Sequence, residues 1–186
     1  MAVPPVFVAG QVLTAAQMNQ IGLWQVKAKT SFTAATSVTV DNVFTSDFQD
    51  YLLILRYETS TAAQNINYQN RVGGVSATTN YNFQRLLVAS TTVSGARTTA
   101  QASFPVGLGT GPGYPSLASV IISGPQLAGP TNATVHVSHA DNSYAVPIMW
   151  YSASNHSTAV AYDGFELSVG GGANATGNYT VWGFRP

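Results

Sequence analysis

The chain has 186 residues, of which 45% are hydrophobic and only 8% are charged. Seven basic residues balance seven acidic ones and cysteine is absent, which excludes a basic nucleic-acid-binding surface, disulfides and thiolate metal sites. This length suits one domain with its own hydrophobic core. Because a net charge of zero favours association, we expect the chain to work inside an assembly.

The first 29 residues are expected to form an extended arm with one short helix. Thr14 and Gln17 fit a capping box, and Leu13 and Met18 fit the hydrophobic staple around it. This helix would have about two turns, whereas isolated helices need roughly 12–15 residues. We therefore predict an anchor that docks on another surface. Its predicted contact residues are Phe7, Leu13, Met18, Ile21 and Trp24.

Residues 30–186 are predicted to form a jelly-roll-like antiparallel β-sandwich of about 8–10 strands. Short β-type runs alternate with Gly, Pro, Asn and Ser at a spacing of about ten residues, which is typical of sandwiches and barrels. The runs are 36–40, 51–58, 66–74, 81–90, 101–107, 118–124, 133–139, 145–153, 164–170 and 178–184. No convincing helix is predicted after Gly22.

Residues that could carry catalysis or bind a metal are present, but their spacing is unfavourable. His136 and His139 are three apart, so on one strand they point to opposite faces, and Asp141 follows in a turn. A Ser/His/Asp triad stays open in a Ser-rich chain, although no nucleophile elbow is present. Asp163 and Glu166 would not face each other on a strand. We predict no catalytic residue, no metal and no cofactor.

Exposed aromatic side chains beside Asn, Ser and Thr suit sugar rings, which combine apolar faces with hydroxyl groups. The alternative for most of them is a place in the core or in a subunit interface. Loops 107–115, 141–144 and 153–158 are the candidate recognition loops. The predicted contacts with a glycan or receptor are Tyr114, Tyr144, Tyr151, Asn155 and His156.

Several phrases of the sequence resemble one class of viral protein. FVAGQVLTAAQMN resembles the opening of minor tail and fibre-like proteins of tailed bacteriophages, where F-x-A-G-x-x-L-T-A-A-x-M-N precedes a β domain. YLLILRYETSTAAQNINYQNRVGG, TNYNFQRLLV and AYDGFELSVGGGANATGNYTVWGFRP resemble the body and end of the same proteins. The closing phrase is Trp182–Gly183–Phe184–Arg185.

The resemblance implies a non-enzymatic virion protein, commonly a homotrimer. Residues 1–29 would bind other virion proteins of the tail or capsid, and the sandwich would face a host cell-surface glycan. Assembly in the host cytoplasm accords with a start that lacks the pattern of a secretion signal. We expect neither nucleic-acid binding nor membrane insertion.

Three alternatives to a minor tail protein are kept. A capsid decoration or head fibre protein would share the fold and the trimer, and a free carbohydrate-binding module would be a monomer with a dispensable N-terminus. A glycan-degrading tailspike enzyme is disfavoured by the small size and by the lack of a recognisable pair of carboxylates.

Overall fold

The computed structural model describes residue 10 and residues 22–61, 64–140 and 147–184. The predicted helix and the anchor residues Phe7, Leu13, Met18 and Ile21 lie outside the described residues, as does Tyr144.

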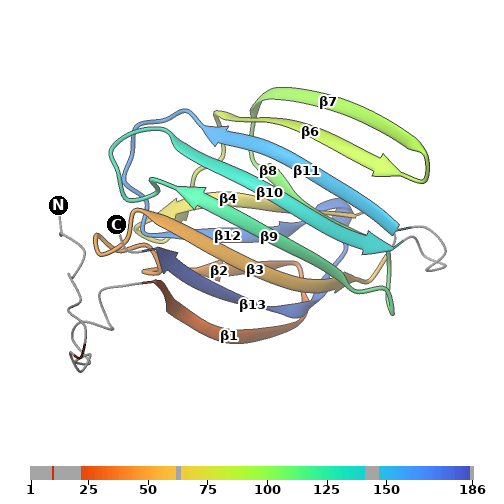
Figure 1. Cartoon of the computed structure of the whole chain (residues 1–186), viewed down its shortest axis with the longest axis horizontal. Coiled ribbons are helices and arrows are strands. Elements are labelled where there is room, and N and C mark those ends of the chain that lie inside the picture. The colour runs from red at the N-terminus through yellow and green to blue at the C-terminus, as the bar shows by residue number, and fades with distance from the viewer. Residues whose placement is uncertain (1–9, 11–21, 62–63, 141–146, 185–186) are drawn as a thin grey trace.

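The described chain is almost entirely β, and its two antiparallel sheets pack as a sandwich (Figure 1). The larger sheet has eight strands in the order β1-β13-β3-β9-β10-β11-β6-β7. In that order the strands span Leu23–Ala35, Ala175–Phe184, Asp50–Thr59, Ser116–Ser123, Thr131–Ala140, Pro147–His156, Tyr81–Ala89 and Thr92–Gln101. This arrangement confirms the predicted all-β antiparallel sandwich.

The smaller sheet has five strands. Strands β2 (Ser37–Val40), β12 (Gly164–Val169), β4 (Gln64–Val72) and β5 (Val75–Ser76) follow one another, and β8 (Phe104–Gly109) pairs with β4. Among the described residues, the helical element is a 3-10 turn at Gly170–Gly172.

Strands β1, β5 and β7 differ from the sequence prediction, which placed no strand there. The two long ones form the outer edges of the eight-stranded sheet, and most of their residues are exposed. An edge strand can be held by backbone hydrogen bonds to one neighbour, so it needs no apolar alternation that the sequence would reveal. Because β1 begins at Leu23 and pairs with β13, the sheet starts before the predicted domain boundary at residue 30.

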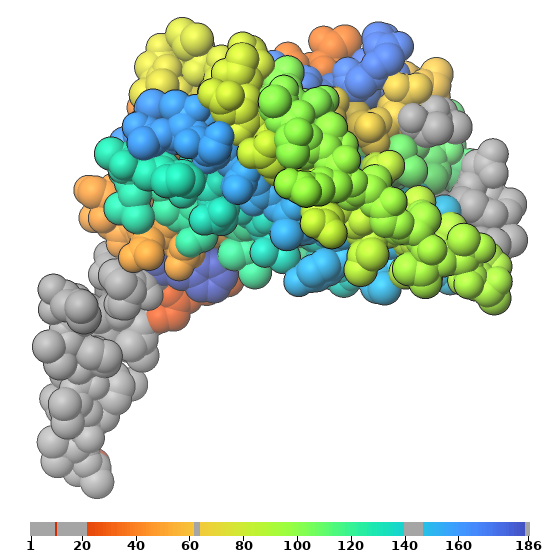
Figure 2. Space-filling model, turned by 90° about the horizontal axis from the view of Figure 1, so that it is seen from above, coloured from red at the N-terminus to blue at the C-terminus, as the bar shows by residue number. Residues whose placement is uncertain are grey.

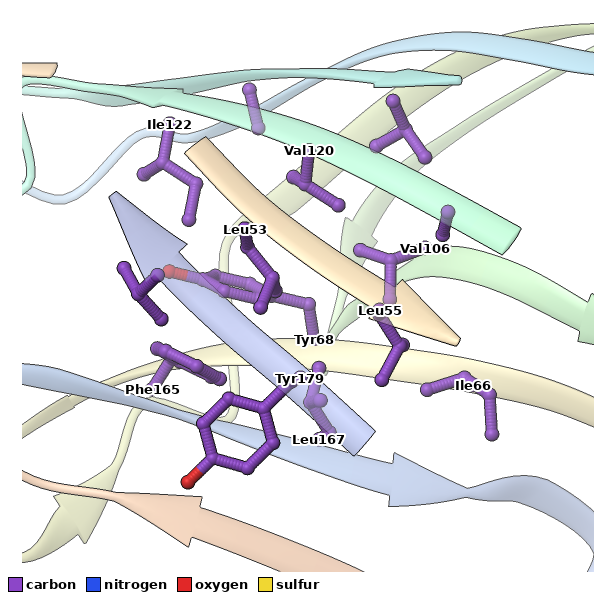
Figure 3. Close-up of a cluster of buried hydrophobic side chains, with 14 of the residues drawn as sticks. Leu53, Leu55, Ile66, Tyr68, Val106, Val120, Ile122, Phe165, Leu167 and Tyr179 are labelled. Atoms are coloured by element: carbon purple, nitrogen blue, oxygen red, sulfur yellow. The ribbon is translucent and has the colours of Figure 1, made fainter. Parts of the chain in front are cut away.

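The core lies between the two sheets, where buried side chains from both sheets meet (Figure 3). Along central strands such as β3 and β9, these inward-facing residues alternate with outward-facing ones. Leu53 and Leu55 of β3 are fully buried there, together with Phe165 of β12. The Phe165 ring stacks on Tyr68 of β4, with ring centroids 5.6 Å apart and an interplanar angle of 18°. Each buried Leu or Phe contributes roughly 1.5–3 kcal/mol relative to an exposed one.

Candidate functional site

The candidate site lies on the outer face of the eight-stranded sheet, which points away from the core. The register places Asn132 of β10, Asn155 of β11 and Asn82 of β6 side by side in one row. The next row holds Thr134, Ala153 and Gln84, and it continues to Arg97 on β7. Side chains directly opposite each other in such rows are about 5 Å apart at Cβ. Four neighbouring strands thus form one polar surface.

A groove of about 440 Å³ runs over this polar surface. Strands β6 and β7, which supply one side of it, lie on the near surface of the molecule in Figure 2, with β7 in green. Its volume falls within the range of small-molecule sites, about 300–1,000 Å³. The lining residues are Asn82, Phe83, Gln84, Arg97, Thr98, Thr99, Asn132, Ala153, Ser154 and Asn155.

Two amides at one end of the groove are oriented by hydrogen bonds. The backbone N–H of Ala100 donates to Oδ1 of Asn82 over 3.1 Å, and Nδ2 of Asn82 donates to Oδ1 of Asn155 over 2.8 Å. A backbone N–H can only donate, so it fixes which end of the Asn82 amide is oxygen. The Asn155 amide is fixed in turn, which leaves its NH₂ group available to a ligand.

A β-bulge positions the backbone N–H of Ala100, which donates to Asn82. Between Tyr81 and Phe83 of β6, strand β7 advances from Gln101 to Thr98, one residue more than its partner. Ala100 in the bulge has φ = 56°, a left-handed conformation that alanine rarely adopts. Such bulges redirect backbone groups near functional sites, and here the redirected group is the Ala100 N–H.

An apolar strip borders the groove along the same face. Tyr151 of β11 pairs with Leu86 of β6, and Met149 lies in line with Val88 and Val93. The side chains of Tyr151, Leu86, Met149 and Val93 are 51%, 53%, 48% and 64% exposed. An amide-rich groove beside an exposed aromatic ring can bind a molecule that has both hydroxyl groups and apolar faces.

The structure places the predicted contact residues in different environments. Tyr151 and Asn155 share the outer face, and Asn155 lines the groove. Tyr114 is half-buried in the loop between β8 and β9, outside the groove lining. Trp24, expected in the anchoring arm, lies in edge strand β1 opposite Gly183 and is 40% exposed.

His156 faces the core and therefore leaves the candidate set. It is 2% exposed, and its Nδ1 lies 3.0 Å from the hydroxyl of Tyr162. Burial lowers the pKa of His156 below its ordinary value. The physical reason is strand alternation: Asn155 and His156 are consecutive, so they cannot point to the same face.

The sequence prediction missed Asn82, Gln84, Asn132 and Arg97 as site residues. Asn82 and Gln84 lie in a predicted strand, where alternation already put them on one face. Alternation does not reveal which strand lies beside β6. In the structure this neighbour is β11, which is distant in sequence, and not the preceding strand β5.

Other chemistry-bearing groups are engaged elsewhere or lie apart. His136 is exposed and His139 is 4% exposed, so they occupy opposite faces of β10 as predicted. Glu166 lies 3.3 Å from Arg71, and Asp163 accepts a hydrogen bond from the Gly73 N–H. Within the described ranges, no three His, Cys, Asp or Glu side chains gather as a metal site would require.

In the same part of the chain, no helix has the length and apolar character needed to cross a membrane. Compared with known proteins, the chain matches no family model, no curated protein sequence and no solved structure.

Proposed function

We propose that this chain is a non-enzymatic structural protein of a tailed-bacteriophage virion, of the minor tail or fibre type. Residues 1–22, which precede β1, anchor it, and the β-sandwich faces the host surface. Support for the viral assignment comes from the sequence phrases that resemble such proteins and from a charge-poor composition suited to assembly. The observation that carries the attachment role is the amide-lined groove beside the exposed ring of Tyr151.

The groove suits attachment because it offers recognition without a reactive group. Amides donate and accept hydrogen bonds, as sugar hydroxyls do, and each such contact contributes a modest ~0.5–1.5 kcal/mol. Binding by one groove is therefore weak. In a homotrimer three grooves act together, and linked sites can raise overall avidity by roughly 10²–10⁴ over one site.

Immunogold labelling of purified virions with an antibody to the sandwich tests the viral assignment. We expect label at the tail. Label on the head would replace the tail role with that of a capsid decoration or head fibre protein. If virions carried no label, the proposal would be overturned.

Met18→Asp tests the anchor and should block incorporation into virions, since a charge on a docking face cannot be offset by packing. Normal incorporation of this variant would contradict anchoring through Met18.

Two measurements on the purified chain separate the remaining classes. Light scattering should give the mass of a trimer, whereas a monomer that binds glycans would identify a free carbohydrate-binding module. A reducing-sugar assay on host cell-wall glycan should stay at background. Release of sugar ends by the chain would contradict the non-enzymatic assignment.

A further inference from the structure

We propose that the outer-face groove binds a sugar chain bearing an acidic group, with the Arg97 guanidinium at the acid and the amides at the hydroxyls. This inference rests on the proposed attachment function and names the ligand of that site. Three features of the groove carry it: its charge, its mixture of donors and acceptors, and its shape.

Charge gives the groove its preference for an acid. Arg97 is the one charged residue among the lining residues. The ion pairs that the described chain contains join Arg71 to Asp41 and Glu166, and Arg97 takes part in neither. An exposed guanidinium with no carboxylate beside it forms charge-assisted, bidentate hydrogen bonds to carboxylate or phosphate. The chain, whose net charge is zero, thus has a local positive site at Arg97.

The amides distinguish a sugar from a bare anion. Side chains of Gln84 and Asn132 form no hydrogen bond to another described residue, so their donors and acceptors both face solvent. The NH₂ group of Asn155 is oriented by its contact with Asn82. Carbonyl oxygens repel an inorganic anion but accept from hydroxyl groups, which also accept from the NH₂ groups.

The shape follows from a small residue in the middle of a row. Ala153 lies between Thr134 and Gln84, and its single methyl group leaves a hollow between longer neighbours. Tyr151 lies two residues away on the same strand and face, a rise of about 7 Å. A sugar ring over Ala153 therefore has Gln84 beside it and Arg97 one strand further along the row, and it brings the next ring of the sugar chain to Tyr151.

Calorimetric titration of the full chain tests this assignment. The probes are oligogalacturonate, which carries carboxylates, a phosphorylated oligomannose, and the uncharged counterpart of each: the methyl ester and plain oligomannose. We expect at least one acidic probe to bind at least tenfold more tightly than its uncharged counterpart. Which probe binds separates a carboxylate from a phosphate ligand. Failure of both acidic probes, or equal binding of charged and uncharged forms, overturns the proposal.

Variants locate the binding in the groove. Arg97→Gln should weaken binding of the acidic probe at least tenfold and leave the uncharged form unchanged, whereas Ala153→Leu should fill the hollow and weaken both. Arg56→Gln is the matched control, because Arg56 is an exposed arginine of the same face outside the groove lining. Equal losses for Arg97→Gln and Arg56→Gln would show nonspecific attraction and overturn the site.

Virions carrying Arg97→Gln separate this inference from the proposed function. We expect normal incorporation with reduced adsorption to the host. Normal adsorption would contradict the Arg97 site and leave the structural role standing, whereas absence of the wild-type chain from virions contradicts the proposed function itself.

Discussion

Gly177 in β13 lies where the backbone of β3 leaves no room for a side chain. A Cβ at this position would overlap the carbonyl oxygen of Arg56 and lie 2.8 Å from the Cα of Tyr57. Both are backbone atoms, so the overlap cannot be relieved by turning a side chain. Gly177→Ala should lower the free energy of unfolding by about 1–3 kcal/mol in denaturant titration, as overpacking does.

Gly129 provides the matched control for this substitution. A Cβ there would meet no atom within 4 Å, so Gly129→Ala should change stability by less than about 0.5 kcal/mol, as surface substitutions usually do. Similar losses at both positions would show that close packing at Gly177 is not the cause.

Arg71 holds together three segments around the smaller sheet. Its Nε lies 2.8 Å from Asp41, and its terminal nitrogens contact Glu166, Ser76 and the Gly74 carbonyl. The Arg71 side chain is only 10% exposed. Arg71→Met should therefore cost about 1–3 kcal/mol, because it leaves the partly buried Glu166 carboxylate without its cation and removes the hydrogen bonds to Ser76 and Gly74. Denaturant titration measures this loss.

Arg56→Met is the corresponding control, since Arg56 is exposed and belongs to neither ion pair of the described chain. It should shift the unfolding free energy by less than about 0.5 kcal/mol. If the two variants were equally stable, the contacts of Arg71 would contribute nothing beyond those of a surface arginine.

His156 links stability to pH. Because burial lowers its pKa below the ordinary 6.5, the unfolded state binds the proton more readily than the folded state. The contribution of His156 is therefore complete above pH 6.5 and is lost as pH falls through the folded pKa. Unfolding titrations from pH 8 to pH 5 should show this loss, and it should be smaller in His156→Gln. An unchanged pH dependence in the variant would contradict the linkage.

At the scale of the element, the central strands were predictable and the two edges of the eight-stranded sheet, β1 and β7, were not. Strands β3 and β9 alternate between buried and less buried residues throughout, and their apolar sequences indicate that they are core strands. Strand β7 is exposed along most of its length, and its sequence TVSGARTTAQ has no such period. Because β7 lacks this period and was not predicted, the side of the groove that it forms was not predicted either. That side holds Arg97 and the bulge at Ala100.

The place of β1 in the sheet determines how an N-terminal truncation should affect stability. Removing residues 1–22 leaves the whole strand in place, so the sandwich should keep its stability. Removing residues 1–35 takes away Val26 and Phe32, which pack against the core, and frees the edge of β13. We expect a lower melting temperature by circular dichroism only in the shorter protein. Equal melting temperatures would mean that β1 contributes little to the fold.

The topology of the whole molecule determines how the chain must fold. Leu23 pairs with Phe184, so the first and last strands are neighbours in one sheet (Figure 1). Closing such distant pairs costs entropy before contacts repay it, which slows folding to about milliseconds to seconds in sandwiches. Stopped-flow refolding, monitored by the fluorescence of buried Trp150, should fall in that range. Relaxation in microseconds would contradict this expectation.

The sequence by itself determined the all-β class, ten of the strands in outline and the alternation that separates His136 from His139. It determined these because side-chain direction along a strand repeats every two residues and depends on no distant partner. Tertiary structure alone decided that β11 lies between β10 and β6, and so brought Asn132, Asn155 and Asn82 into one row. Strand order results from how two sheets bury their apolar faces together, a property of the whole molecule that local alternation does not encode.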